Sequence, residues 1–113
     1  MPVTLFHNPK CGTSRNALVL LREKGVEPTV VEYLKTGWDR PTLERLAAKT
    51  GLGVAGLLRK KEAEAAALLA AGADDETIIA AAVAQPILIE RPIVESDKGA
   101  VIGRPVQRVL DVL

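Results

Sequence analysis

The chain has 113 residues and a mass of 12.0 kDa, a length typical of one domain and sufficient to bury a core without disulfides or metals. Hydrophobic residues make up 48% and charged residues 26%, which is the balance of an ordinary globular protein. The formal net charge is +1, which argues against a nucleic-acid-binding protein, because that class usually carries a strong basic excess.

The first part of the chain predicts a βαβ unit. Residues 3–6 are a short apolar run that favours a buried strand opening onto a loop. Thr13 or Ser14 is expected to cap a helix that ends near Lys24. A second strand is expected at residues 30–33, parallel to the first, because a helix connects the two.

The middle of the chain is expected to be helical. With their cap and stop residues, the expected helices cover residues 39–51, 54–59, 62–71 and 74–85. Asp39, and then Asp74 or Asp75, are the expected N-caps, because an aspartate side chain accepts hydrogen bonds from the first unpaired N–H groups of a helix.

The last part predicts a hairpin and a closing helix. Strands at residues 92–95 and 100–102 flank a turn-forming stretch, and Pro105 is expected to begin the final helix. The order βαβ, helices, ββα indicates an α/β fold of the thioredoxin-like type, with a four-stranded mixed sheet flanked by helices. We expect a single domain over residues 1–113, with a helical insertion at about 39–85.

Cys11 is the one cysteine of the chain, which excludes an internal disulfide and a multi-thiolate zinc site. No apolar run reaches the roughly 18 residues of a membrane span, and the first residues do not resemble a signal peptide. We therefore expect no membrane partner and a cytoplasmic location, where a free thiol stays reduced.

Cys11 falls between the first predicted strand and the first predicted helix. The unpaired amides of a helix start carry partial positive charge and stabilise an anion such as a thiolate. His7, Lys10 and Arg15 are close enough in sequence to add positive charge. The alternative is a small buried cysteine, but Gly12 and the polar residues around it are unlike a core segment and favour a reactive thiol.

The same helix start predicts an oxyanion site, with Gly12 and Thr13 among its ligands. An oxyanion beside a thiolate needs further cations, and arginine suits this because its guanidinium grips two oxygens at once. The candidates are Arg59, at the end of a predicted short helix, and Arg91 and Arg104, which both precede a proline. Each could instead be a solvated surface group.

Two polar residues of this region allow two interpretations each. His7 could stabilise the thiolate, or it could be a packed, hydrogen-bonded histidine. Ser14 could donate to the sulfur, cap the helix, or do both.

Residues 7–16 resemble the active-site loop of the ArsC-type arsenate reductases, the glutaredoxin-dependent kind. The likeness continues in the same order through residues 57–60, 86–94 and 103–105, and so spans essentially the whole chain. The resemblance implies a thioredoxin-like fold in which Pro92 is the cis-proline.

The resemblance also implies residue roles. Cys11 would be the nucleophile, His7 would help to lower its pKa, and Ser14 would interact with the thiolate. Three arginines would bind the oxyanion and the arsenic adduct: Arg59, Arg91 and Arg104. Reduction of arsenate takes two electrons, so a chain with one thiol needs a second thiol from another molecule. The family implies glutathione and glutaredoxin for this, with no bound metal or prosthetic group.

Three other functions compete with this one. A phosphatase-like arsenate reductase needs an arginine six residues after the cysteine, where this chain has Ala17. An Spx-like regulator of RNA polymerase typically carries a Cys-x-x-Cys switch, but Ser14 stands at the second cysteine position. A general glutathione-linked thiol oxidoreductase stays open as the main alternative.

Overall fold

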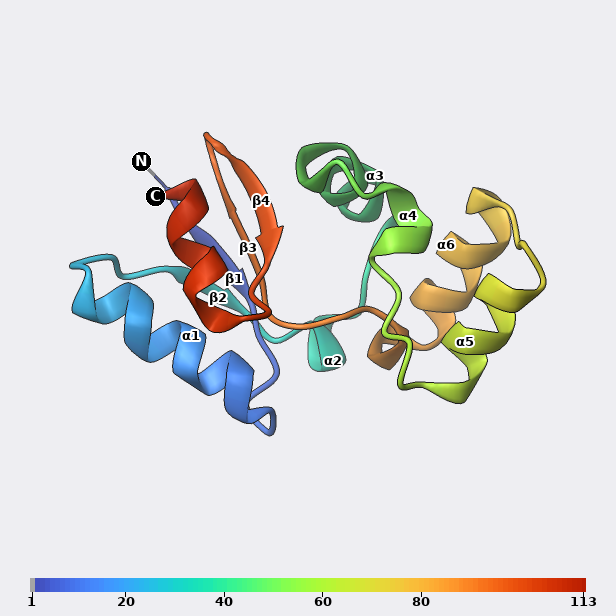
Figure 1. The fold of residues 1–113 in the computed structure, drawn as a ribbon, viewed down its shortest axis with the longest axis horizontal. Coiled ribbons are helices and arrows are strands. Elements are labelled where there is room, and N and C mark those ends of the chain that lie inside the picture. The colour runs from blue at the N-terminus through green and yellow to red at the C-terminus, as the bar shows by residue number, and fades with distance from the viewer. Residues whose placement is uncertain (1) are drawn as a thin grey trace. The chain divides into compact units, whose positions relative to one another are not determined.

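The computed structural model describes residues 2–113, which divide into two compact units (Figure 1). The first unit comprises the chain up to Thr36 together with Arg91–Leu113, and the second is Gly37–Glu90. The second unit covers the stretch in which the helical insertion was expected.

A mixed sheet forms the centre of the first unit. Its strands are β1 (Thr4–Phe6), β2 (Thr29–Val31), β3 (Ile93–Ser96) and β4 (Gly99–Ile102). In the described part of the chain the sheet has four strands in the order β2-β1-β3-β4, with β1 parallel to β2 and the other neighbours antiparallel. The predicted α/β fold with a four-stranded mixed sheet is confirmed.

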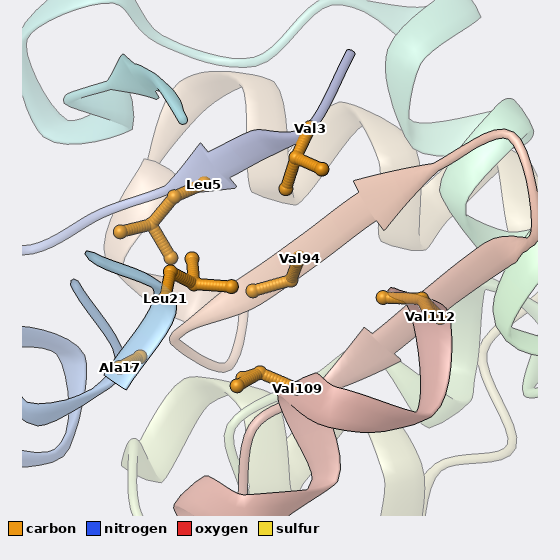
Figure 2. Packing of buried hydrophobic residues seen from close by; sticks show 7 residues of the cluster. All are labelled: Val3, Leu5, Ala17, Leu21, Val94, Val109 and Val112. Atoms are coloured by element: carbon orange, nitrogen blue, oxygen red, sulfur yellow. The ribbon is translucent and has the colours of Figure 1, made fainter. Parts of the chain in front are cut away.

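Two helices pack on this sheet, α1 (Gly12–Glu23) and the 3₁₀ helix η2 (Val106–Val112). Figure 2 shows the core where apolar side chains of the strands meet those of both helices. Its members are Val3, Leu5, Ala17, Leu21, Val94, Val109 and Val112. Burial of one large apolar side chain contributes about 1.5–3 kcal/mol. This core therefore fixes the helix start next to Cys11 relative to the sheet.

Three details of the first unit differ from the sequence prediction. Helix α1 begins two to three residues earlier than expected, so that Cys11 itself is the N-cap, with φ −94° and ψ 123°. Strand β2 ends at Val31, and the buried Tyr33 instead begins the short helix α2 (Tyr33–Thr36). The closing helix η2 is 3₁₀ rather than α. Short elements of this kind depend on packing more than on local propensity.

The second unit is helical. It contains α3 (Arg40–Thr50), α4 (Gly53–Gly56), α5 (Ala63–Ala70), α6 (Asp75–Ala84) and the 3₁₀ turn η1 (Pro86–Leu88). The predicted caps are confirmed, because Asp39 accepts a hydrogen bond from the Thr42 N–H and Asp74 accepts one from the Thr77 N–H. These bonds lower the pKa of both carboxyl groups.

The predicted helix over residues 54–59 is too long. Helix α4 ends at Gly56, and Leu58 forms an isolated antiparallel bridge with Ile89. The Arg59 N–H donates to the Leu88 carbonyl at 2.7 Å, and the Glu90 N–H donates to the Leu57 carbonyl at 2.8 Å. Arg59 therefore follows a strand-like pairing, not the end of a helix.

Gly103 lies where β4 leads into η2. Its N–H donates to the Pro92 carbonyl at 2.8 Å, across from the start of β3. A Cβ at this position would lie 2.9 Å from Cγ1 of Val109 and 3.0 Å from Cγ of Pro92. A side chain at these distances would force Val109 or Pro92 to shift, so this close approach favours glycine.

Candidate active site around Cys11

The loop after β1 holds Cys11 at the first turn of α1. The Cys11 N–H donates to the Asn8 carbonyl at 3.0 Å, and the Cys11 carbonyl accepts the Arg15 N–H at 3.0 Å. The residue is partly exposed. Its sulfur therefore lies at the positive end of a 12-residue helix and remains accessible to a small reactant.

Two of the predicted arginines meet at this sulfur. Nη2 of Arg104 donates to Sγ of Cys11 at 3.4 Å, and Nε of Arg104 donates to the Arg91 carbonyl at 2.7 Å. Arg91 also forms a side-chain hydrogen bond with the thiol. The peptide bonds Arg91–Pro92 and Arg104–Pro105 are both cis, as the resemblance implied for Pro92.

Opposing effects set the pKa of the Cys11 thiol. Burial raises it, whereas hydrogen bonds from the Ser14 backbone N–H and the Arg91 side chain lower it, as do the charges of Arg104 and Arg91. The net result is a pKa below the ordinary value. The thiolate, which is the nucleophilic form, is therefore more populated at neutral pH than in a free cysteine.

His7 and Ser14 are buried and hydrogen-bonded to each other. Nδ1 of His7 lies 2.7 Å from Oγ of Ser14, which also accepts the Asn8 N–H at 3.0 Å. Burial lowers the pKa of His7, the Glu32 carboxylate raises it less, and Arg15 lowers it further. A neutral imidazole at neutral pH fits a packed histidine better than a cation. Ser14 contributes to the thiol pKa through its backbone N–H.

Hydrogen bonds from polar groups within and beside the loop hold the rest of it in place. Oδ1 of Asn8 accepts the Lys10 N–H at 3.0 Å, and Nη1 of Arg15 donates to the Pro9 carbonyl at 2.9 Å. Asn8 was not among the residues predicted for the site, although an asparagine before a proline is typical of such a turn. Gly12 is exposed and Thr13 half-buried, so both lie near the surface beside the sulfur.

Arg59 has different surroundings. It belongs to the second unit, where its Nη1 lies 2.6 Å from Oε1 of Glu90. The side chains are 12% and 20% exposed, so the ion pair is largely shielded from water. The approach of Arg59 to Cys11 stays a prediction.

Comparison of the chain with known proteins identifies its family. The model of the ArsC family matches residues 6–112. The chain belongs to the ArsC family. The resemblance to the ArsC family, recognised from the loop and the arginine segments, is thereby confirmed.

Relatives within the ArsC family match along the full chain. An arsenate reductase of Rhizobium meliloti (strain 1021) is 45% identical over 115 residues, covering 100% of this chain and 82% of the relative. An arsenate reductase of Escherichia coli (strain K12) is 42% identical over 113 residues, covering 98% and 80%. The solved structure of an arsenate reductase from Vibrio cholerae superposes with a TM-score of 0.92 at 40% identity, covering 100% of this chain and 98% of that one.

The described residues contain no helix long and apolar enough to cross a membrane.

Proposed function

We propose that this protein reduces arsenate to arsenite through the Cys11 thiolate. The observation that carries the proposal is the sulfur itself, which lies at the N-cap of α1, has a lowered pKa and accepts a hydrogen bond from Arg104. The names of the ArsC relatives supply arsenate as the substrate.

In the first step the thiolate attacks arsenic. A sulfur–arsenic bond forms, and one arsenate oxygen leaves as water after it takes up a proton. The guanidinium groups of Arg91 and Arg104 offset the negative charge that the thiolate and the oxyanion bring together. The backbone amides of Gly12 and Thr13 are proposed to bind arsenate oxygens at the helix start.

The remaining steps need external thiols, because the chain has one cysteine. We propose that glutathione attacks the adduct and forms a second sulfur–arsenic bond with loss of water. A glutaredoxin thiolate then attacks the glutathione sulfur, the bonding electron pair passes to arsenic, and As(V) becomes As(III). Hydrolysis releases arsenite and restores Cys11. No bound metal or prosthetic group takes part, and the need for glutathione suits the cytoplasm.

Two further roles belong to the proposal. Arg59 is proposed as the third arginine of the oxyanion site, for which its partial burial and rigid ion pair with Glu90 are suitable. His7 is proposed to act through Ser14, because their hydrogen bond fixes the helix turn whose Ser14 N–H stabilises the thiolate.

The Cys11→Ser variant tests the proposal. We expect loss of at least about 10³-fold in arsenite production with glutathione and glutaredoxin, because a hydroxyl at neutral pH is a far weaker nucleophile than a thiolate. An unchanged circular dichroism spectrum is the control for folding. Arsenite production at the wild-type rate in this variant would end the proposal.

A parallel assay separates the alternative function. A general thiol oxidoreductase would reduce a glutathione mixed disulfide efficiently and show only slow arsenate turnover. We expect the reverse order of kcat/KM, because the arginines beside the thiol suit an oxyanion.

A further inference from the structure

A surface pocket of about 190 Å³ adjoins the loop that carries the thiol. Its lining consists of Asn8, Pro9, Lys10, Glu32, Leu34 and Lys35. The first three directly precede Cys11, Glu32 directly follows β2, and Leu34 and Lys35 belong to α2. Lys10 and Cys11 are consecutive, with Cα atoms ~3.8 Å apart, so the wall of the pocket adjoins the residue that carries the sulfur.

The loop side of the pocket is formed in advance. The side chain of Asn8 accepts the Lys10 N–H, Arg15 holds the Pro9 carbonyl, and the His7 N–H donates to the Val31 carbonyl at 2.8 Å. These bonds join the loop to β2 and to α1. A preformed wall of this kind lowers the entropic cost of binding a small ligand.

The charges around the pocket are of both signs. Lys10 and Lys35 supply two ammonium groups, Glu32 supplies one carboxylate, and Leu34 is 40% exposed. Nζ of Lys35 lies 3.5 Å from Oε1 of Glu32, a surface pair that costs little to open. A ligand with one carboxylate and one ammonium group on neighbouring atoms complements this pattern. A bare oxyanion does not, because it would face Glu32.

We propose that this pocket binds the γ-glutamyl end of the glutathione that attacks the Cys11–arsenic adduct. That end is an α-amino acid group, whose carboxylate pairs with Lys10 or Lys35 and whose ammonium pairs with Glu32. A volume of about 190 Å³ is below the ~300–1,000 Å³ of a complete small-molecule site, so the pocket holds one end of the peptide and leaves the cysteinyl sulfur outside it. The inference rests on the proposed function and locates its thiol donor.

Binding of a glutathione analogue to the pocket is measured first, with a ligand that cannot react. S-methylglutathione keeps every charged group of glutathione and has no reactive thiol, so its binding to the wild-type chain is followed by calorimetric titration. We expect Lys35→Met to weaken binding about fivefold, the loss of one surface ion pair. The matched control is Lys24→Met, an exposed lysine at the opposite end of α1 from Cys11, for which we expect no change.

Two ligand analogues identify the end that is bound. The S-methyl derivative of γ-glutamylcysteine, which lacks the glycine, should bind as tightly as S-methylglutathione, whereas that of cysteinylglycine should bind at least about fivefold more weakly. Glu32→Gln should weaken binding of S-methylglutathione but not of its N-acetyl derivative, which has no ammonium group. Equal binding of the two truncated derivatives, or equal effects of Lys24→Met and Lys35→Met, would overturn the inference.

A kinetic measurement separates this inference from the proposed function. In the arsenate assay, Lys35→Met should raise the KM for glutathione and leave the KM for arsenate unchanged. Arsenate turnover without binding of S-methylglutathione at the pocket would refute the glutathione site alone. Pocket binding without arsenate turnover would refute the reductase function and retain the site.

Discussion

Arginines in the two units of the molecule are held in different ways. In the first unit, Arg104 donates from two nitrogens, one to the Cys11 sulfur and one to the Arg91 carbonyl. In the second unit, the Arg59 guanidinium is paired with the Glu90 carboxylate. In the first arrangement the positive charge of Arg104 stabilises the Cys11 thiolate. In the second, the positive charge of Arg59 is neutralised by a carboxylate of the same unit. Only the first therefore changes the acidity of the thiol directly.

Among the substitutions that leave Cys11 in place, the largest effect is expected at Arg104. Arg104→Gln removes a charge and a hydrogen-bond donor from the thiolate, so the pKa of Cys11 should rise and kcat/KM for arsenate should fall by about 10²-fold. The thiol pKa is measured from the pH dependence of thiolate absorbance or of alkylation by iodoacetamide. A thiol pKa equal to that of the wild type would show that the guanidinium does not act on the sulfur.

Arg91→Lys keeps the charge and changes its shape. A lysine loses the two-pronged grip on an oxyanion, so we expect about tenfold lower kcat/KM for arsenate, with a smaller rise in the thiol pKa than in Arg104→Gln. Steady-state kinetics and the same alkylation assay check both points. Unchanged kinetics would remove Arg91 from the oxyanion site.

Glu90→Gln tests the pair in the second unit. The substitution leaves the partly buried Arg59 without a carboxylate at 2.6 Å, which should lower the free energy of unfolding by about 1–3 kcal/mol in urea denaturation. The thiol pKa should stay unchanged, because neither residue contributes to it. A shifted thiol pKa would contradict the division between the two arginine arrangements.

The smallest effect is expected at His7, where the pH dependence of stability tests whether the imidazole is neutral. A neutral imidazole would leave the arginines as the source of positive charge near the sulfur. The pKa of His7 is lowered mainly by burial, so the unfolded chain binds more protons as the pH falls below about 6.5. Stability should therefore decrease as the pH is lowered through this range. Urea midpoints at pH 7.5 and 5.5 should differ less in His7→Gln than in the wild type. An equal difference would mean that His7 binds its proton over the same pH range in the folded and the unfolded chain.

Local signals predicted most of the first unit. The hairpin was expected from its turn residues, and its register pairs Ile93 with Ile102, so Arg91 and Arg104 lie just beyond the same end. Their proximity is thus a consequence of the strand pairing. The predicted start of α1 was two to three residues too late because a cysteine is an unusual N-cap, whereas threonine and serine, as at Thr13 and Ser14, are common ones.

The sequence was less informative where distant segments pair. Leu58 bridges Ile89, thirty-one residues along, and this pairing ends the short helix before Arg59. No local pattern shows such a contact. Likewise, the sequence allows two roles each for His7 and Ser14, because the role depends on which buried partner the side chain contacts. In the structure the two side chains are hydrogen-bonded to each other.

Gly103 lies between the hydrophobic core and the arginine that contacts the Cys11 sulfur. Its missing side chain lets β4 turn within contact of Pro92 and Val109, and the next residue is the arginine that touches the sulfur. A single added methyl group would meet Cγ1 of Val109 at 2.9 Å, so that some part of this packing would have to shift one residue away from the guanidinium. The surroundings of the thiol thus include a residue that bears no functional group and never meets a reactant.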